Sequence, residues 1–196
     1  MKYLDVEEAI DSTGLRLVLT AGVPGPWGEA AKSILAFKNL AYTPVLQQGG
    51  GHNEALRQWT GQTSAPVAVS EDFPPVCHWF DLLMLAERLG PENPLVPQDC
   101  TARIDVLGIS ALIAGAEGFG WCRRLQMLAP MLLLPEPPDI AVRLGAKYGW
   151  TAEALAMSTG RLESISAELD GRLLRQEAAG SGFIVGSTLS AAGFYW

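Results

Sequence analysis

The side chains in this sequence that are best suited to chemistry are three cysteines and two histidines. Cys77, Cys100 and Cys122 are widely spaced and form no Cys-x-x-Cys pair, and the histidines are His52 and His78. This pattern predicts reduced thiols, with neither a disulfide framework nor a metal site. Because Cys77 and His78 are adjacent, a thiol nucleophile activated by a base is one interpretation of the pair. Neighbours in a helix do not face each other, however, and a cysteine is often only a small buried hydrophobe.

Composition and charge exclude several classes of protein. Hydrophobic residues make up 48% of the 196 residues and charged residues 18%, which is typical of globular domains. The net charge of −7 argues against nucleic acid as a partner, because affinity for phosphates depends on clustered Lys and Arg. The N-terminus lacks a signal-peptide core, and the most apolar run, Leu125 to Leu134, is far shorter than the roughly 20 residues that span a bilayer. We therefore expect a cytoplasmic protein with no membrane partner.

The first half of the sequence alternates expected strands and helices. The patterns predict strands at 15–19, 42–47, 67–69 and 74–76, and helices at 27–38, 53–59 and 79–89. Asn53 is the expected N-cap of the second helix. The prolines of the last strand confine it to a sheet edge. The order βαβαββα is that of a thioredoxin-like domain, which we assign to residues 15–89, after an N-terminal extension at 1–14.

The second half of the sequence reads as helical. A linker is expected at 90–99, which contains three prolines, followed by an all-α domain at 100–196. The segment from Gly118 to Gly120 should break the first long helix, since each glycine costs about 1 kcal/mol relative to alanine in a helix interior. A further break is expected at 134–138, and Thr151 should cap a long helix that ends before Gly180. The predicted fold class is thus α/β plus all-α.

Two segments stand where one two-domain architecture would have them. Ser64 to Val69 reads as a strand entered through Pro66, and Phe183 to Ala192 as a loop leading into a capped helix. Together with the βαβ pattern before residue 50, these segments resemble the cytosolic glutathione transferase superfamily over nearly the whole chain. The resemblance implies a thioredoxin-like domain followed by a helical domain. It also implies glutathione as co-substrate, no metal, a small hydrophobic electrophile as second substrate, and a role in detoxification.

The resemblance further implies where a thiol would be activated. The family places a Ser, Cys or Tyr after the first strand, where the N-terminus of the first helix helps to lower the pKa of the glutathione thiol. The matching motif here is Gly25-Pro26-Trp27-Gly28, so the side chain at the catalytic position is absent. Thr20 and the backbone N–H groups near Pro26 and Trp27 are the candidates to replace it. Taken alone, Gly25-Pro26 is also an ordinary turn with proline at the first helical position.

Two further pairs of residues match positions that hold glutathione in the family. Ala65 and Pro66 match the cis-proline segment that pairs with the backbone of the glutathione cysteine. An ordinary trans proline is the alternative, since only about 5–6% of X-Pro bonds are cis. Cys77 and His78 stand where the family has an acidic residue and a serine for the γ-glutamyl group. His78 could donate to a carboxylate at a helix N-terminus, but the acidic partner is missing.

The segment Gly120 to Arg124 is the candidate for the second substrate. In the resembling fold this segment faces the substrate cleft, so Trp121 would line the cleft and Arg124 would meet an anionic group. A core tryptophan beside a solvated arginine is the alternative interpretation. Tyr148 and Trp150 have the same ambiguity.

A homodimer with two-fold symmetry is also expected, since that is the commonest oligomer. Its predicted interface is the helix at 79–89 together with the helix around Ile104 to Gly115. Gly108, Ala111 and Gly115 lie roughly on one face, and small residues allow two helices to approach closely.

The last segment departs from the family pattern. Ser190 to Gly193 stands where the family has the capping box Ser-x-x-Asp, and Gly193 removes the acid, weakening the cap by about 1 kcal/mol. The sequence stops at Trp196, inside an expected core helix that continues in relatives. Either a truncated product or the absence of the final helical layer is expected.

The leading hypothesis is therefore a glutathione transferase-like protein that binds glutathione or a related thiol and conjugates it to small hydrophobic electrophiles. A non-catalytic binding or interaction module on the same fold is the alternative, favoured by the residues at Gly25, Cys77 and Gly193. An unrelated thioredoxin-like oxidoreductase is disfavoured, because no cysteine lies near residues 24–28.

Overall fold

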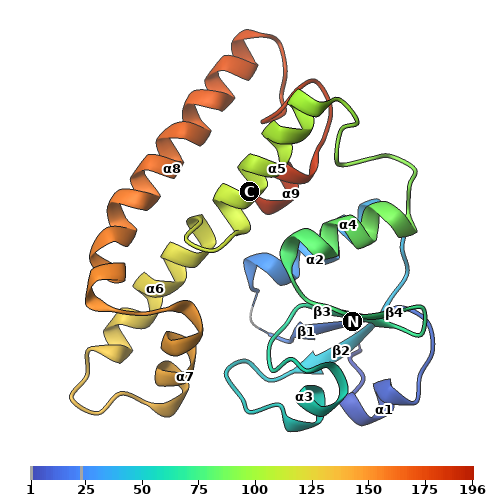
Figure 1. Cartoon of the computed structure of the whole chain (residues 1–196), viewed down its shortest axis with the longest axis vertical. Coiled ribbons are helices and arrows are strands. Elements are labelled where there is room, and N and C mark those ends of the chain that lie inside the picture. The colour runs from blue at the N-terminus through green and yellow to red at the C-terminus, as the bar shows by residue number, and fades with distance from the viewer. Residues whose placement is uncertain (1, 23) are drawn as a thin grey trace. The chain divides into compact units, whose positions relative to one another are not determined.

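The computed structural model describes residues 2–22 and 24–196, and the chain divides into two compact units between Asn93 and Pro94. The first unit contains a four-stranded sheet with helices on both faces, and the second is helical (Figure 1).

The sheet of the first unit has the strand order β2-β1-β3-β4. Its strands are β1 (Arg16–Thr20), β2 (Thr43–Gln47), β3 (Val67–Ser70) and β4 (Phe73–Val76). β2 runs parallel to β1, whereas β3 is antiparallel to β1 and β4 to β3. With α2 (Pro26–Phe37), α3 (Glu54–Thr60) and α4 (Trp79–Leu89), the order after the first helix is βαβαββα. This confirms the thioredoxin-like arrangement expected from the alternating pattern.

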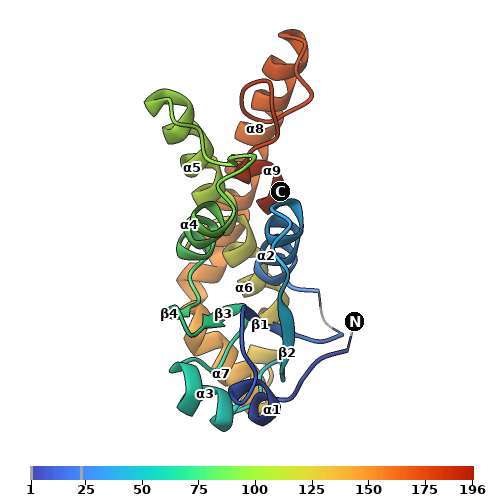
Figure 2. The ribbon, with the colours of Figure 1, turned by 90° about the vertical axis from the view of Figure 1, so that its right-hand side faces the viewer.

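Alternation along the strands divides the apolar residues between two layers. Helices α2 and α4 cover one face of the sheet, while α3 and α1 (Val6–Ile10) cover the other (Figure 2). Val18 and Val45 belong to the second layer, where they pack with the fully buried Ala9 and Leu56. Leu19 points to the opposite layer, since it lies 3.6 Å from the position that a Cβ on Gly28 of α2 would occupy.

The N-terminal segment is an ordered part of this unit. Leu4 pairs with the outer edge of β2: its N–H donates to the carbonyl of Pro44 at 3.0 Å and its carbonyl accepts from Leu46 at 2.9 Å. Helix α1 follows behind a capping box made by Asp5 and Glu8. The segment therefore covers a strand edge that would otherwise present unpaired backbone groups.

The second unit is built on a broken helix. It comprises α5 (Cys100–Ala114), α6 (Phe119–Leu132), α7 (Asp139–Tyr148), α8 (Ala152–Ala178) and α9 (Ala191–Tyr195), with α6 packed on α7 and α8, and α5 on α9. The predicted break begins earlier than expected, at Gly115. A Cβ at Gly115 would lie 2.6 Å from the carbonyl oxygen of Ala111, and one at Gly118 would lie 2.7 Å from that of Leu112. Only glycine fits this close approach of backbone to backbone.

The start of α9 lacks its side-chain cap. Ser190 makes no capping hydrogen bond, and its Oγ is buried without a partner in the described residues. Gly193 supplies no carboxylate there, as its type predicted. A backbone bond from the N–H of Ala191 to the carbonyl of Leu95, at 2.9 Å, ties the helix start instead.

The stretch Cys100–Leu132 is long and apolar enough to cross a membrane, if length and composition alone are considered. It spans the break between α5 and α6. Core helices of soluble proteins meet the same criterion, and Val106, Ile109, Leu125 and Leu128 of this stretch are buried within the unit. The stretch is therefore weak evidence for a membrane-spanning helix.

A buried ion pair joins the C-terminal ends of α2 and α4. Lys38 Nζ lies 2.5 Å from Glu87 Oε1, with no exposure of the lysine side chain, and it also donates to the carbonyl of Gly90 at 2.8 Å. Removing one partner of such a pair leaves a buried charge without compensation. The pair thus makes the α2–α4 packing depend on both residues.

Replacing Glu87 by Gln should lower the free energy of unfolding by about 3 kcal/mol, because Lys38 would stay charged and buried. The matched change Glu29→Gln removes an exposed partner of Lys32 and should cost less than about 1 kcal/mol. Urea unfolding of both variants measures the difference. Equal losses in the two variants would show that the buried pair has no special role.

Candidate functional site

The start of α2 is the first part of the candidate site. Gly25 is its N-cap, in an extended conformation with φ −110° and ψ 138°, and no side chain caps the helix. Pro26 occupies the first helical position, and the N–H of Glu29 donates to the carbonyl of Gly25 at 2.9 Å. The positive end of the helix dipole lies at this position and favours an anion such as a thiolate. Val23, in the loop before it, lies outside the described residues.

Gly25 tolerates a side chain. Its φ is ordinary for any residue, and a Cβ there would meet no heavy atom within 4 Å. Glycine is thus not required by the backbone at this position. The absence of a hydroxyl or thiol is a property of the sequence and not a consequence of the fold.

Thr20 lies at the end of β1, but its hydroxyl hydrogen is already used. Thr20 Oγ1 donates to Gln47 Oε1 at 2.5 Å. The orientation of this amide is fixed, because Gln47 Nε2 donates to the carbonyls of Gln48 at 2.8 Å and Thr63 at 3.1 Å, which leaves the amide oxygen for Thr20. In this arrangement the Thr20 side chain has no hydroxyl proton left to donate to a thiolate.

Asn53 closes the glycine-rich loop that follows β2. Its Oδ1 accepts from the N–H of Gln48 at 3.0 Å, and its Nδ2 lies within 3.1 Å of the carbonyls of Gln48, Gly51 and Thr63. Its backbone is left-handed, with φ 48°, and its side chain makes no bond to α3. The prediction that Asn53 is the N-cap of this helix is confirmed, but its side chain makes no capping bond, because the loop carbonyls compete successfully for its amide.

The carbonyl of Thr63 consequently accepts from two side-chain amides, those of Gln47 and Asn53. Thr63 lies two residues before Ala65, and the Ala65–Pro66 bond is cis, as predicted. The two amides thus hold the backbone segment that leads into β3. The sequence did not predict this role of Gln47. Its one indication in the sequence was that a polar residue ends the expected strand at 42–47.

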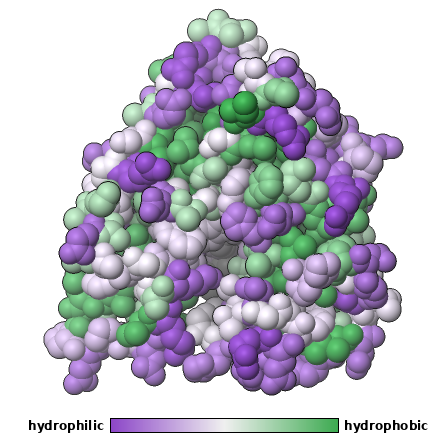
Figure 3. All heavy atoms as spheres, in the orientation of Figure 1, coloured by the Kyte–Doolittle hydropathy of each residue, from purple (hydrophilic) through white to green (hydrophobic). Residues whose placement is uncertain are grey.

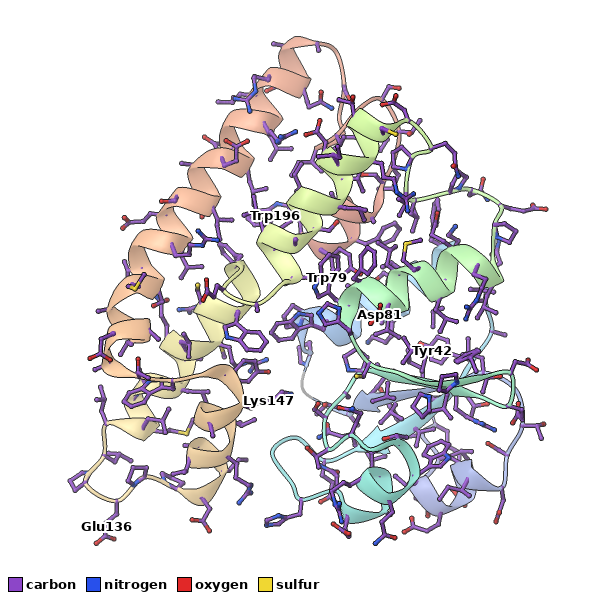
Figure 4. All side chains as sticks on the ribbon, viewed as in Figure 1. Tyr42, Trp79, Asp81, Glu136, Lys147 and Trp196 are labelled. Atoms are coloured by element: carbon purple, nitrogen blue, oxygen red, sulfur yellow. The ribbon has the colours of Figure 1, made fainter. Side chains whose placement is uncertain are left out.

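Cys77 and His78 lie at the start of α4. Cys77 is an exposed free thiol, and His78 is the N-cap residue, without a side-chain capping bond. The centre of the His78 ring lies 5.7 Å from the centre of the ring of Trp79, which is labelled in Figure 4. The thiol–imidazole pair considered from the sequence stays a prediction.

In the helical unit, Trp121 and Arg124 both contact Tyr148. The indole Nε1 of Trp121 donates to the carbonyl of Tyr148 at 2.9 Å, and the two rings meet edge to face at 4.8 Å. The Arg124 guanidinium lies 5.8 Å from the centre of the Tyr148 ring. Burial raises the pKa of the Tyr148 hydroxyl, and the charge of Arg124 and a hydrogen bond from it oppose that rise.

Among residues 2–22 and 24–196, no group of three or more His, Cys, Asp or Glu side chains is placed to hold a metal ion. The three cysteines are free thiols, and Cys122 is buried in α6.

The sequence matches no protein-family model and no curated protein. Its structure resembles a glutathione S-transferase from Methylobacterium radiotolerans in complex with glutathione sulfonate, at 18% identity and a TM-score of 0.68, over 92% of this chain and 74% of that one. It also resembles a glutathione S-transferase from Methylobacillus flagellatus with glutathione bound, at 16% identity and a TM-score of 0.69, over 93% and 79% of the two chains.

A third similar structure is the beta-etherase LigF from Sphingobium, at 17% identity and a TM-score of 0.68, over 92% of this chain and 80% of that one. These likenesses extend over both units. The chain therefore has the fold of the glutathione transferase superfamily, with a thioredoxin-like domain and a helical domain.

Replacing Asn53 by Asp should lower the free energy of unfolding by about 1–3 kcal/mol, because a carboxylate cannot donate to the three carbonyls that its amide now serves. Amide hydrogen exchange should also become faster at residues 63–67. The matched control is Asn39→Asp, since Asn39 is exposed and has a similar left-handed backbone with φ 54°. Unchanged exchange at residues 63–67 in the Asn53 variant would contradict the role assigned to this amide.

Proposed function

We propose that this protein binds glutathione or a related thiol in its thioredoxin-like unit and conjugates it slowly to small hydrophobic electrophiles. The observation that carries the proposal is the uncapped N-terminus of α2 in a fold shared with solved glutathione transferases, two of which contain glutathione or its sulfonate. The N–H groups near Pro26 and Trp27 would face the thiolate, and the backbone of Ala65, before Pro66, would pair with the peptide part of the ligand.

Electrostatics at α2 are compatible with a bound anion. Glu29 places one negative charge in the first turn, but Lys32 Nζ lies 2.7 Å from its carboxylate and offsets it. The helix dipole then favours a thiolate over a thiol. Turnover is expected to be slow, because Gly25 offers no donor and the Thr20 proton is held by Gln47.

A non-catalytic binding module is the second candidate function. It is favoured by the missing side chain at Gly25 and by Cys77 and His78, which stand where relatives are expected to hold the γ-glutamyl group. The two candidates differ in turnover, and a module that serves only for interaction would not need to bind a thiol. Retention on immobilised glutathione with elution by free glutathione tests thiol binding. Failure to be retained would count against the transferase and leave the interaction module standing.

We further propose that the hydrophobic electrophile lies against Trp121 and Arg124, and that the protein acts in the cytosol in a detoxifying role. Free thiols at Cys77, Cys100 and Cys122 are compatible with a reducing compartment. Conjugation assays with several electrophiles would test the substrate class.

Placing a serine at Gly25 should raise the rate of conjugation of a chloro-nitrobenzene by roughly 10²–10³, because a hydroxyl donor at this position would stabilise the thiolate. Gly25→Ala is the matched control, since it adds the Cβ without the hydroxyl. The free energy of unfolding of the Gly25→Ser variant should differ from that of the wild type by only a few tenths of a kcal/mol. If the Ser and Ala variants turned over equally, the hydroxyl would not be the missing element.

Two further variants complete the same assay. Thr20→Val should leave turnover unchanged while lowering stability by about 1–3 kcal/mol, since it leaves the Gln47 amide oxygen without its donor. A triple Cys→Ala variant should retain the wild-type rate. Strong wild-type turnover that this triple change abolished would instead assign the chemistry to a cysteine.

A homodimer through α4 and α5 is also proposed. Ile104 is 72% exposed on α5, with Gly108 and Ala111 exposed along the same face. Figure 3 shows apolar residues at the surface over this helix. A Cβ at Gly108 would meet no atom within 4 Å, so the chain itself leaves this face open to a second copy.

Replacing Ala111 by Arg should convert the dimer to a monomer, because a charged side chain would be buried between the two copies. Ala167→Arg, at an exposed position of α8, should leave the dimer intact. Sedimentation at micromolar concentration measures both. A monomeric wild-type protein would refute the proposed interface.

A further inference from the structure

Gly25 leaves open space where a side chain would otherwise stand beside a ligand sulfur. A Cβ built on it would meet no heavy atom of the described residues within 4 Å, and its backbone is extended, with φ −110°. The next residue, Pro26, occupies the first helical position and has no backbone N–H to donate. The start of α2 therefore combines free volume with a shortage of hydrogen-bond donors.

Thr20 cannot make up for this shortage without a cost elsewhere. Its hydroxyl donates to Gln47 Oε1, and Gln47 is only 4% exposed. Turning the hydroxyl toward a ligand would leave that amide oxygen buried without a donor, which is unfavourable. The methyl group of Thr20 lies toward the glycine-rich loop, since a Cβ built on Gly49 would lie 3.2 Å from Thr20 Cγ2. We therefore expect Thr20 to keep its bond to Gln47 when a ligand binds.

These two features matter because a thiol and a thioether need different things from a site. A thiolate is charged and gains from hydrogen-bond donors, each of which contributes about tenfold or more in affinity. The sulfur of a thioether is uncharged and only a weak acceptor, so it loses little where donors are missing. Its substituent, in turn, needs room beside the sulfur. Gly25 supplies that room and withholds the donor.

We infer that the thioredoxin-like unit binds S-substituted glutathione, a thioether, more tightly than the free thiol. The inference rests on the proposed function, because it concerns the same site, and it names the class of ligand that this site prefers. A thioether is what conjugation yields. A protein with this preference would hold its product longer than its substrate.

The test compares glutathione with S-methylglutathione, in which a methyl group replaces the thiol hydrogen. Isothermal titration calorimetry on the full chain measures both affinities at about pH 6.5, where a thiol with the ordinary pKa of about 8.5 is protonated. All other groups of the two ligands are the same, so the ratio of the dissociation constants reports on the sulfur alone. The wild type should bind S-methylglutathione about threefold more tightly, close to the fourfold that full burial of one methyl group gives.

Variants at Gly25 separate the open space from the missing donor. Gly25→Ala fills the space without adding a donor and should bring the two affinities close to equal. Gly25→Ser fills it and adds a hydroxyl, so it should change the ratio about tenfold and favour glutathione. The matched control is Gly160→Ala in α8, because a Cβ there would also meet no heavy atom of the described residues within 4 Å. It should keep the wild-type ratio.

A spectroscopic measurement checks the same cause. Ultraviolet difference spectra detect the thiolate form of bound glutathione. The wild type should show no thiolate at the pH of the titrations, since the helix dipole alone shifts a thiol pKa only slightly. Gly25→Ser should show it, because a hydroxyl donor stabilises the charged form.

The outcomes separate this inference from the proposed function. Equal or tighter binding of glutathione by the wild type would overturn the inference and leave the proposed function standing. A preference for the thioether that both Gly25 variants kept would also overturn it, because the open position would not be its cause. If neither ligand bound, the proposed function would fail and the inference with it. If Gly25→Ser failed to fold, the wild type and Gly25→Ala would decide.

Discussion

A single buried amide joins three parts of the thioredoxin-like unit that are far apart in the sequence. Gln47, at the end of β2, accepts from Thr20 at the end of β1 and donates to the carbonyl of Thr63 before β3, while its own side chain is almost fully buried. The amide oxygen can only accept and the amide nitrogen can only donate. Because the nitrogen donates to Thr63, the oxygen must accept from Thr20. The segment that precedes Pro66 is therefore positioned by side chains, before the ladder of β3 begins.

This arrangement has a chemical consequence. The hydroxyl of Thr20 gives its proton to the hydrogen bond with the Gln47 oxygen. Gly25 has no side chain that could supply another donor. A thiolate would then be stabilised only by backbone N–H groups and the dipole of α2. This stabilisation is weaker than that from the same groups together with a hydroxyl donor. The fold shared with solved glutathione transferases is present, while Gly25 lacks the side chain that would most accelerate the proposed reaction. That combination favours binding over rapid turnover.

Sequence patterns predicted the elements well because those elements depend on local periodicity. The strands of the sheet, α2 and α4 were recognisable from apolar spacing, and the break near Gly118 from glycine itself. The hydrogen bonds of Gln47 and Asn53 were not, since their partners lie up to 27 residues away and depend on how the sheet is assembled. The capping box of α1 was missed although Asp5 and Glu8 have its spacing. The contact of Arg124 with Tyr148 likewise depends on α7, which brings the ring to it.

A hydroxyl donor at Gly25 and a contact to a distant part of the electrophile would affect different kinetic constants. The donor would act on the thiolate itself and hence on kcat. A contact far from the carbon that is attacked would stabilise the bound substrate and the transition state alike, and would act mainly on KM. It would raise kcat only if it also fixed the angle of attack. If thiol activation rested on backbone groups alone, tight capture of the electrophile would therefore compensate for slow chemistry only at low substrate concentration.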